Sequence, residues 1–154
     1  MRAFSIRPLA EHDLDALLGL YAQLHPTDVA LPARAQVLNV WQAIRSDPKL
    51  HCLGGFVGDE LAVSCLLSIT PNLTRGCRPF GLIENVITRA DHRRRGYGRA
   101  LLLHASDIAW QHGCYKVMLQ TGRKDEVTLA FYESAGFDRQ TKQAFWAAAP
   151  VRAV

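Results

Sequence analysis

The chain has 154 residues, of which 49% are hydrophobic and 21% are charged. This length supports one domain with a buried core and is too short for two ordinary domains, so we expect a single domain over residues 1–154. The composition excludes an intrinsically disordered chain. The net charge of +4 is only mildly basic, so the position of the positive charge says more about partners than its total.

The expected cellular setting follows from the termini and the cysteines. The N-terminus has no apolar stretch typical of a secretory signal, and no run approaches the ~18 apolar residues of a membrane span. The cysteines Cys52, Cys65, Cys77 and Cys114 show neither metal-ligand nor redox spacing, and three of them sit in apolar runs. We therefore expect free thiols, a cytoplasmic protein and no membrane partner.

The hydrophobic pattern alternates between the period of strands and the period of helices. In chain order, the expected elements are a short strand that begins at Phe4 and stops at Pro8, helices over 11–25 and 34–46, a hairpin of strands over 50–57 and 61–69, a strand over 80–88, a helix over 98–112, a strand over 115–121, a helix over 126–135 and a last strand over 142–148. Prolines or glycines follow most of these patterns and mark their ends.

The order of these elements predicts the fold class. Strands and helices are mixed rather than strictly alternating, so we expect an α/β fold of the α+β type with a mostly antiparallel central sheet flanked by helices. One parallel βαβ unit should consist of the strand over 80–88, the helix over 98–112 and the strand over 115–121.

A turn rich in arginine and glycine lies between the strand over 80–88 and the following helix. Gly96 and Gly98 would let the backbone approach a ligand without a Cβ in the way. The N–H groups of about Arg94 to Arg99 would then point at an anion, which the helix dipole also favours. The pattern predicts a phosphate-binding loop. The alternatives are a helix start with solvated arginines, or a nucleic-acid-binding module, which is disfavoured because no exposed aromatics are interleaved.

Three motifs resemble those of the GCN5-related N-acetyltransferases (GNAT). They are the loop Arg93-x-x-Gly96-x-Gly98, the segment Ala130-Phe131-Tyr132-x-x-x-Gly136-Phe137, and the opening Ile6-Arg7-Pro8 with Asp13-Leu14. The resemblance implies a GNAT domain with acetyl-CoA as co-substrate. It also implies an acyl-CoA-dependent N-acetyltransferase that needs no metal and transfers acetyl directly to a primary amine in a ternary complex.

The resemblance also implies how acetyl-CoA would bind. In the family, the strand before the loop splays from its neighbour, and the pantetheine arm bonds to its backbone, here at Val86, Ile87 and Thr88. The residues expected around the diphosphate are Arg93, Arg94, Arg95, Gly96, Tyr97, Gly98 and Arg99. Tyr132 occupies the position whose side chain, in many members of the family, protonates the leaving thiolate of CoA. Its alternative role is packing, with the hydroxyl bonded to a backbone carbonyl.

Glu84 is the candidate general base. Strict alternation along the strand predicts that Leu82, Glu84, Val86 and Thr88 share one face, and that Ile83, Asn85 and Ile87 share the other. A carboxylate in so apolar a strand is costly to bury without a partner. The family often places a glutamate on this strand to take the proton of the amine. The alternative is a structural ion pair with Arg75, Arg78 or Arg99, and both roles stay open.

Two positions depart from the family pattern. Many members carry an asparagine that contacts CoA where this chain has Asp125, which we instead expect to cap the helix that follows. Protein N-terminal acetyltransferases use a glutamate as the base where this chain has Gln120. This difference disfavours that class of enzyme and favours Glu84 as the base. The six histidines have no spaced partners, so no metal site is expected. His92, beside the loop, is expected in a solvated turn.

The acceptor is not encoded in a recognisable motif. Asn72, Arg75 and Arg78 precede the catalytic strand and could bind a carboxylate or phosphate of the acceptor. Ile83-Glu84-Asn85-Val86 resembles the Ile-Glu-Asp-Val of glucosamine-phosphate acetyltransferases, a likeness too short to fix a substrate. We expect a small-molecule amine. A protein lysine or N-terminal acetyltransferase and a non-catalytic acyl-CoA-binding module remain alternatives, no nucleic-acid partner is expected, and a homodimer is left open.

Overall fold

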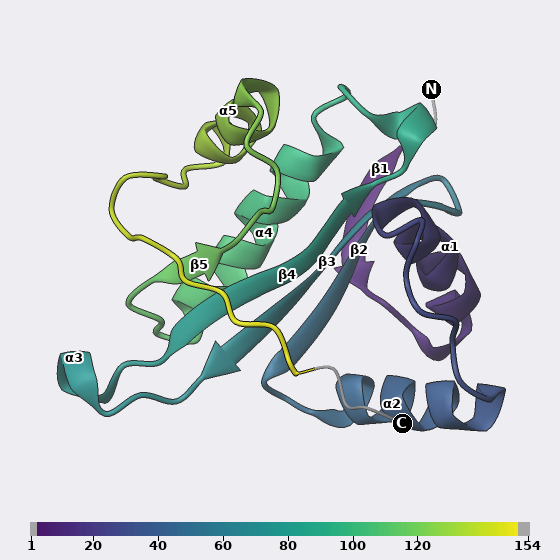
Figure 1. Ribbon diagram of the computed structural model, residues 1–154, viewed down its shortest axis with the longest axis horizontal. Coiled ribbons are helices and arrows are strands. Elements are labelled where there is room, and N and C mark those ends of the chain that lie inside the picture. The colour runs from purple at the N-terminus through teal and green to yellow at the C-terminus, as the bar shows by residue number, and fades with distance from the viewer. Residues whose placement is uncertain (1–2, 151–154) are drawn as a thin grey trace.

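The computed structural model describes residues 3–150, built on a five-stranded sheet in the order β1-β2-β3-β4-β5 (Figure 1). The strands are β1 (Phe4–Pro8), β2 (Leu50–Val57), β3 (Glu60–Thr70), β4 (Phe80–Thr88) and β5 (Val117–Leu119). The helices are α1 (Leu14–Leu24), α2 (Arg34–Ser46), α3 (Thr74–Cys77), α4 (Tyr97–Gln111) and α5 (Glu126–Ser134), with 3₁₀ turns η1 (Glu11–Asp13) and η2 (Ala90–His92).

Strands β1 to β4 pair antiparallel, and only β5 runs parallel to its neighbour β4. Helix α4 forms the crossover between β4 and β5, as a parallel connection requires. The expected fold class, a mixed and mostly antiparallel sheet with one parallel βαβ unit, is confirmed.

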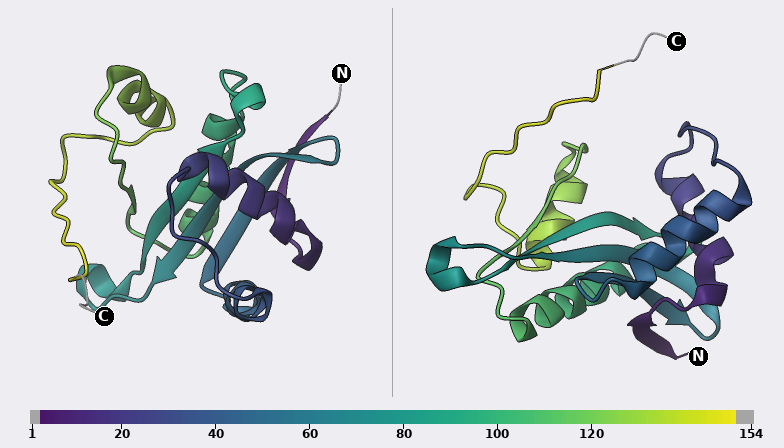
Figure 2. Two further views of the ribbon diagram at one scale, coloured as in Figure 1. Left: turned by 45° about the vertical axis from the view of Figure 1, so that its right-hand side comes forward. Right: turned by 90° about the horizontal axis from the view of Figure 1, so that it is seen from below.

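Helices cover both faces of the sheet (Figure 2). Helices α1 and α2 pack on one face and share a cluster of buried apolar side chains with β2 and β3. Helix α4 packs on the other face, where Leu101, Leu102, Ala105 and Ala109 are fully buried, and α5 packs beside it. Burying a leucine side chain contributes about 2 kcal/mol, so this stripe explains why residues 97–111 are held as a helix on the sheet.

An ion pair ties the first strand to the first helix. The Arg7 guanidinium donates to both carboxylate oxygens of Asp13, at 2.6 and 3.1 Å. The backbone N–H of Ala10 donates to the same carboxylate at 2.6 Å. The side chain of Asp13 is only 7% exposed, and the Arg7 hydrogen bond lowers its pKa. The N-terminal motif that contains Arg7 and Asp13 therefore has a structural role, because these two residues fix the start of α1.

The second half of the chain departs from expectation in three elements. Strand β5 has three residues instead of the seven expected over 115–121. The short helix α3 replaces part of an expected loop. The last expected strand, over 142–148, is wrong, because these residues pair with no strand and leave Phe145 and Trp146 91% and 84% exposed. A strand pattern needs a free edge to pair with, and the chain ahead of this segment leads it away from the sheet (Figures 1 and 2).

Candidate active site

Strand β4 contains a bulge at its centre. Opposite Cys65 of β3, the strand places two residues, Asn85 and Val86, because the register between the two strands shifts here. Asn85 has a φ of 54°, in the left-handed region. Asparagine tolerates this conformation better than most residues other than glycine. Two residues opposite one, with a local bend, are the definition of a β-bulge, a feature frequent beside active sites.

The bulge changes which side chains share a face. Ile83 packs in the cluster under α4, whereas Ile87 packs in the cluster under α1. Strict alternation would put both on one face, so that expectation is wrong for β4. Glu84 pairs with Leu66, whose side chain packs under α1, and Glu84 therefore faces α1. Val86 packs on the α4 side and does not share a face with Glu84.

The carboxylate of Glu84 is unengaged. Its side chain is exposed, and it forms no ion pair with any residue from 3 to 150. Two of the three arginines suggested as partners are bonded elsewhere: Arg78 donates to the carbonyls of Gly113 and Cys114, and Arg99 donates to that of Ser134. The structural ion pair is therefore not formed, and Glu84 is free to accept a proton from a ligand on the α1 side.

Strands β4 and β5 separate soon after they meet. They pair at three positions only, from Gly81 opposite Val117 to Ile83 opposite Leu119. Beyond Ile83, the edge of β4 that continues toward the loop has no partner strand within residues 3–150 (Figure 1). The expected splay is confirmed, and it leaves backbone groups of residues 84–88 available to an extended ligand.

The loop before α4 presents a series of unbonded amides. Arg94 and Gly96 have positive φ, 58° and 80°, and α4 begins directly after them. Ala100 is the first residue whose N–H bonds back to the loop, to the carbonyl of Gly96 at 3.0 Å. Within the described chain, the N–H groups of residues 94–99 donate to no backbone acceptor. This arrangement matches an anion-binding helix start.

The two loop glycines have different surroundings, and the expectation that they let the backbone approach a ligand stays a prediction. At Gly96 no atom would lie within 4 Å of an added Cβ, and the positive φ is what favours glycine. At Gly98 an added Cβ would lie 3.0 Å from the Phe131 ring and 3.0 Å from Thr88 Oγ1. Gly98 therefore lets β4, α4 and α5 meet closely.

The side chains of the loop divide between structure and solvent. Arg93 donates to the carbonyl of Thr88 at 3.2 Å, which ties the loop to the end of β4. The Tyr97 ring stacks on Phe4 with centroids 4.4 Å apart, which packs the start of α4 against β1. Arg94 and Arg95 are exposed. Their positive charges are the ones most available to a diphosphate.

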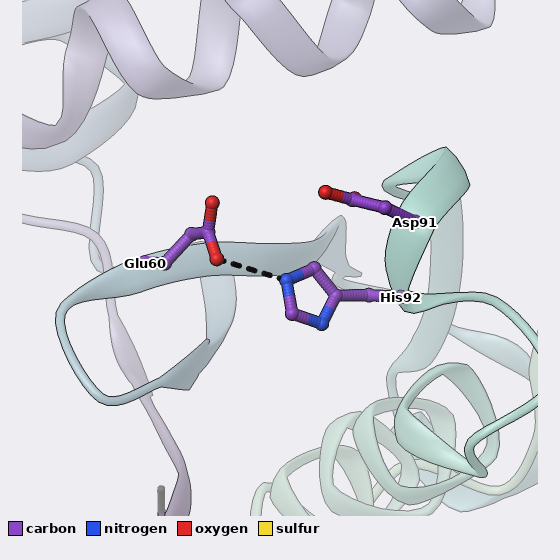
Figure 3. A group of neighbouring side chains, drawn as sticks. All are labelled: Glu60, Asp91 and His92. Carbon is purple, nitrogen blue, oxygen red and sulfur yellow. Dashed lines mark hydrogen bonds and ion pairs between the residues drawn. The ribbon is translucent and has the colours of Figure 1, made fainter.

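An ion-pair network supports the turn that precedes the loop (Figure 3). The side chain of His92 is 9% exposed and its Nε2 lies 3.0 Å from Glu60, so the expectation of a solvated turn is wrong. Arg89 pairs with Glu60 and, at 3.0 Å, with Asp91. Glu60, Asp91 and His92 lie close enough to hold a metal ion. The Arg89 guanidinium already supplies the positive charge between the two carboxylates, so the group serves as an anchor for η2.

Tyr132 projects from α5 into the cluster that lies against α4. Burial raises its pKa, so the phenol remains protonated at neutral pH. Its hydroxyl bonds to no backbone carbonyl among residues 3–150. The alternative role, packing with the hydroxyl bonded to a backbone carbonyl, is therefore not seen. Asp125 accepts from the N–H of Thr128 at 3.0 Å, and its expected role as the helix cap is confirmed.

The three residues suggested for the acceptor lie elsewhere. Asn72 bonds within the turn around α3, and the Arg75 guanidinium sits 5.8 Å from the Tyr115 ring. Arg78 precedes Glu84 by six residues, about 20 Å along an extended strand, and α3 lies at the opposite end of β4 from the loop (Figure 1). The structure does not bring these residues to Glu84 within one chain.

A match to a family of known proteins covers all of these features. The family described as acetyltransferase (GNAT) matches residues 14–137, which include β4, the loop and α5. The chain belongs to the acetyltransferase (GNAT) family. This acetyltransferase is therefore an acyl-CoA-dependent transferase, and acetyl-CoA is its donor substrate. Within residues 3–150, it has no helix long and apolar enough to cross a membrane.

Similar proteins span nearly the whole acetyltransferase. It is 33% identical over 144 residues to the glucosamine 6-phosphate N-acetyltransferase of Trypanosoma brucei brucei, covering 90% of this chain and 91% of the relative. A solved protein of Agrobacterium tumefaciens str. C58, provisionally named an acetyltransferase, is 41% identical with a TM-score of 0.88, covering 94% and 99% of the two chains. A crystal structure of a Trypanosoma brucei acetyltransferase is 30% identical with a TM-score of 0.79, covering 95% and 100%.

Sequence reasoning missed three residues that shape the site. Asn85 was placed in a regular strand, although a polar residue next to Glu84 in an apolar strand is a signal for a bulge. Glu60 and His92 lie far apart in sequence, and no local pattern indicates that they meet. The contact between Glu60 and His92 becomes visible only once the pairing of β3, which begins at Glu60, with the end of β4 is known.

Proposed function

We propose that the acetyltransferase transfers the acetyl group of acetyl-CoA directly to the primary amine of a small molecule. The observation that carries the proposal is the continuity of residues 84–99. This one segment supplies an exposed carboxylate, an unpaired strand edge and a series of free amides, in that order. A donor with a thioester at one end and a diphosphate at the other fits such a segment.

Each loop and strand group has a role in binding the donor. The amides of residues 94–99, with Arg94 and Arg95, hold the diphosphate. The pantetheine arm lies along the free edge of β4 and bonds to the backbone of Val86, Ile87 and Thr88. One N–H of this edge polarises the thioester carbonyl, which stabilises negative charge on its oxygen as the amine attacks.

The transfer needs one proton acceptor and one proton donor. An alkylamine with a pKa near ~10 is mostly protonated at neutral pH, and Glu84 accepts its proton from the α1 side. The amine nitrogen then bonds to the carbonyl carbon, and the carbon–sulfur bond breaks. The departing thiolate takes the phenolic proton of Tyr132, whose pKa is raised by burial. The attacking nitrogen loses its second proton to water, and the Tyr132 phenolate regains a proton from water. The products are an N-acetylated amine and CoA with a free thiol.

We propose a phosphorylated amino sugar as the first acceptor to test. The support is the name of the trypanosome relative, a glucosamine 6-phosphate N-acetyltransferase. A surface hollow of about 410 Å³ beside the loop is lined by Gln23, Arg89, Asp91 and Arg93. Arg89 is already paired with Glu60 and Asp91, whereas Arg93 forms no ion pair among residues 3–150, so Arg93 is the group at this hollow that favours an anionic substituent on a substrate.

The test measures acceptor-dependent release of CoA over a panel of amines, with and without phosphate. Reductant is included, because the free thiols of Cys52, Cys65 and Cys114 fit the reducing cytoplasm that we propose as the compartment. Glu84→Gln should lower kcat ~100-fold or more with the best acceptor, because the uncharged amide accepts no proton. Glu133→Gln, on the exposed face of α5, is the matched control. Wild-type kcat in Glu84→Gln contradicts the assignment.

We further propose that two copies associate. Segment 142–148 has a strand pattern and no partner strand, Phe145 and Trp146 are exposed, and β5 leaves the edge of the sheet open. A second copy could accept the segment on this edge and bury both aromatics. Light scattering over a concentration series tests this. The double variant Phe145→Ser, Trp146→Ser should remain monomeric where the wild type dimerises, and a wild type that is monomeric throughout contradicts the proposal.

A further inference from the structure

A hydrogen bond joins the last turn of α1 to the turn that precedes the loop. The side-chain oxygen Oε1 of Gln23 accepts from the backbone N–H of Ala90 in η2, at 3.1 Å. Because this bond engages the oxygen, the nitrogen Nε2 is the end of the amide that can donate to a ligand. Among residues 3–150, Nε2 of Gln23 donates to no acceptor. Gln23 therefore offers a donor that the rest of the chain does not use.

The hollow of about 410 Å³ beside the loop is lined by Gln23 and by a second donor, Arg93. Nε of Arg93 donates to the carbonyl of Thr88 at 3.2 Å, and its terminal N–H groups bond to no residue from 3 to 150. The negative charge that lines the hollow, on Asp91, is paired with Arg89 at 3.0 Å. A neutral amide from α1 and a cation from the loop are thus the uncommitted donors of one hollow.

The hollow lies on the side of the sheet to which Glu84 is directed. Gln23 belongs to α1, and Glu84 faces α1. Thr88, to which Arg93 is bonded, follows Val86 by two residues, about 7 Å along the proposed donor edge of β4. A small substrate whose amine lies between Glu84 and the thioester can therefore extend a substituent into the hollow.

We propose that Gln23 is a specificity-determining residue, whose amide binds an anionic substituent of the acceptor together with the guanidinium of Arg93. This inference rests on the proposed function, because it assigns a subsite to the acceptor of acetyl transfer. A phosphate monoester has several oxygens and can accept from both side chains at once. Since Gln23 lies on α1 and Arg93 on the loop, such an acceptor bridges the two elements.

The first experiment changes the donating end of Gln23 and keeps its accepting oxygen. In Gln23→Glu the side chain can still accept from the N–H of Ala90, but it has no N–H to donate and it repels an anion. The ratio of kcat/KM for glucosamine 6-phosphate to that for glucosamine should fall about tenfold or more. Gln23→Ala should lower this ratio by about threefold, because it removes the donor without adding a charge. Gln111→Glu is the matched control, because it makes the same charge change at an exposed position in the last turn of α4, away from the loop.

The second experiment separates the acceptor from CoA, which carries phosphates of its own. Calorimetry measures the Kd of CoA alone, and then the Kd of glucosamine 6-phosphate for the protein saturated with CoA. In Gln23→Glu the Kd of CoA should equal that of the wild type, and the Kd of glucosamine 6-phosphate should rise about tenfold. A rise in the Kd of CoA instead would assign the hollow to a phosphate of CoA and overturn the proposal.

Further outcomes decide between this inference and the proposed function. A wild type that prefers glucosamine to glucosamine 6-phosphate overturns the role of Gln23 and leaves acetyl transfer to small amines standing. An unchanged ratio of kcat/KM in Gln23→Glu overturns the role as well. Failure of the proposed function shows separately, as absence of acetyl transfer by the wild type to any amine. The calorimetric result then decides alone, and an equal Kd of glucosamine 6-phosphate in both proteins, or no binding to either, overturns the inference.

Discussion

At the scale of single residues, the two candidate catalytic groups have opposite environments. Glu84 is exposed on the α1 face and has no ion-pair partner within residues 3–150. Tyr132 is partly buried on the other side of the sheet, where burial raises its pKa. Because burial raises the pKa of Tyr132, its phenol stays protonated at neutral pH, which is the state that a proton donor needs before transfer.

The environment of Tyr132 predicts the response to its replacement. Tyr132→Phe should lower kcat by about 10-fold to 100-fold, because the thiolate then leaves without a proton donor. In the wild type, the raised pKa should keep the phenol protonated through the neutral range, so kcat should not decline there through its deprotonation. The measurement is kcat against pH for both proteins with a saturating amine.

Two results would contradict this role of Tyr132. One is a variant with wild-type kcat over the whole range of pH. The other is a basic decline in the wild type near neutral pH that the variant lacks, because such a decline would require a tyrosine with a lowered pKa. Tyr115→Phe serves as the control, since that ring packs near Arg75 and Lys116, near α3.

At the scale of elements, the loop depends on close contact between three parts of the fold. Thr88 ends β4, Gly98 lies in the first turn of α4, and Phe131 projects from α5, and they meet where a Cβ on Gly98 would be only 3.0 Å from its neighbours. The start of α4, and with it the free amides, is therefore positioned by packing on both sides.

This packing predicts opposite effects for two glycine replacements. Gly98→Ala should lower the free energy of unfolding by about 1–3 kcal/mol and weaken CoA binding, because α4 must move away from Phe131 and Thr88. Gly19→Ala, exposed on α1 with no atom within 4 Å of its added Cβ, should raise stability by about 0.5–1 kcal/mol and leave CoA affinity unchanged. Urea denaturation and calorimetry measure both. Equal effects at the two positions would contradict the packing argument.

Most elements were predictable because the periodic spacing of apolar residues can be read from a single sequence. The helix expected over 34–46 is α2, and the helix expected over 98–112 differs from α4 by one residue at each end. The bulge at Asn85 was not predictable from alternation, because the pattern of apolar residues in β4 fits a regular strand equally well. The short β5 and the unpaired segment 142–148 depend on which edges the folded sheet leaves free, and local sequence does not encode that.

The candidate site was predictable to the extent that it lies in one segment. Residues 84–99 carry the candidate base, the strand edge and the loop, and their order in the sequence is their order in space. Asn72, Arg75 and Arg78 were suggested because they precede the same strand, but β4 separates them from the loop by its whole length. Nearness in sequence therefore predicts which groups share β4 and the loop, and it does not predict which other groups the fold brings beside them.

At the scale of the whole molecule, the fold consists of two buried clusters on either side of one sheet. The start of α1 is held to β1 by Arg7, Asp13 and the amide of Ala10. Since the Arg7 hydrogen bond lowers the pKa of Asp13 below its usual 3.8, the ionised carboxylate is favoured in the folded state. Its contribution to stability is present at neutral pH and is lost as the pH falls through the lowered pKa.

Global stability should therefore depend on Asp13 in a defined range of pH. Asp13→Asn should lower the free energy of unfolding by about 1–2 kcal/mol at pH ~7, a modest value because Arg7 is partly exposed. The difference between variant and wild type should shrink as the pH falls below about 4. Asp15→Asn is the matched control, because Asp15 pairs with Arg34 at the surface and is 77% exposed. A difference that grows in acid would contradict the assignment.

The continuity of β4 with the loop also bears on which donors can react. The loop that we propose for the diphosphate and the strand edge that we propose for the thioester arm belong to one stretch of chain, which is held to the sheet at one end by β3 and at the other by α4. The fixed distance between them selects donors by the length of the arm that joins the diphosphate to the thioester. An acetyl thioester on a shorter arm would reach only one of the two sites, and its acetyl group would not be transferred.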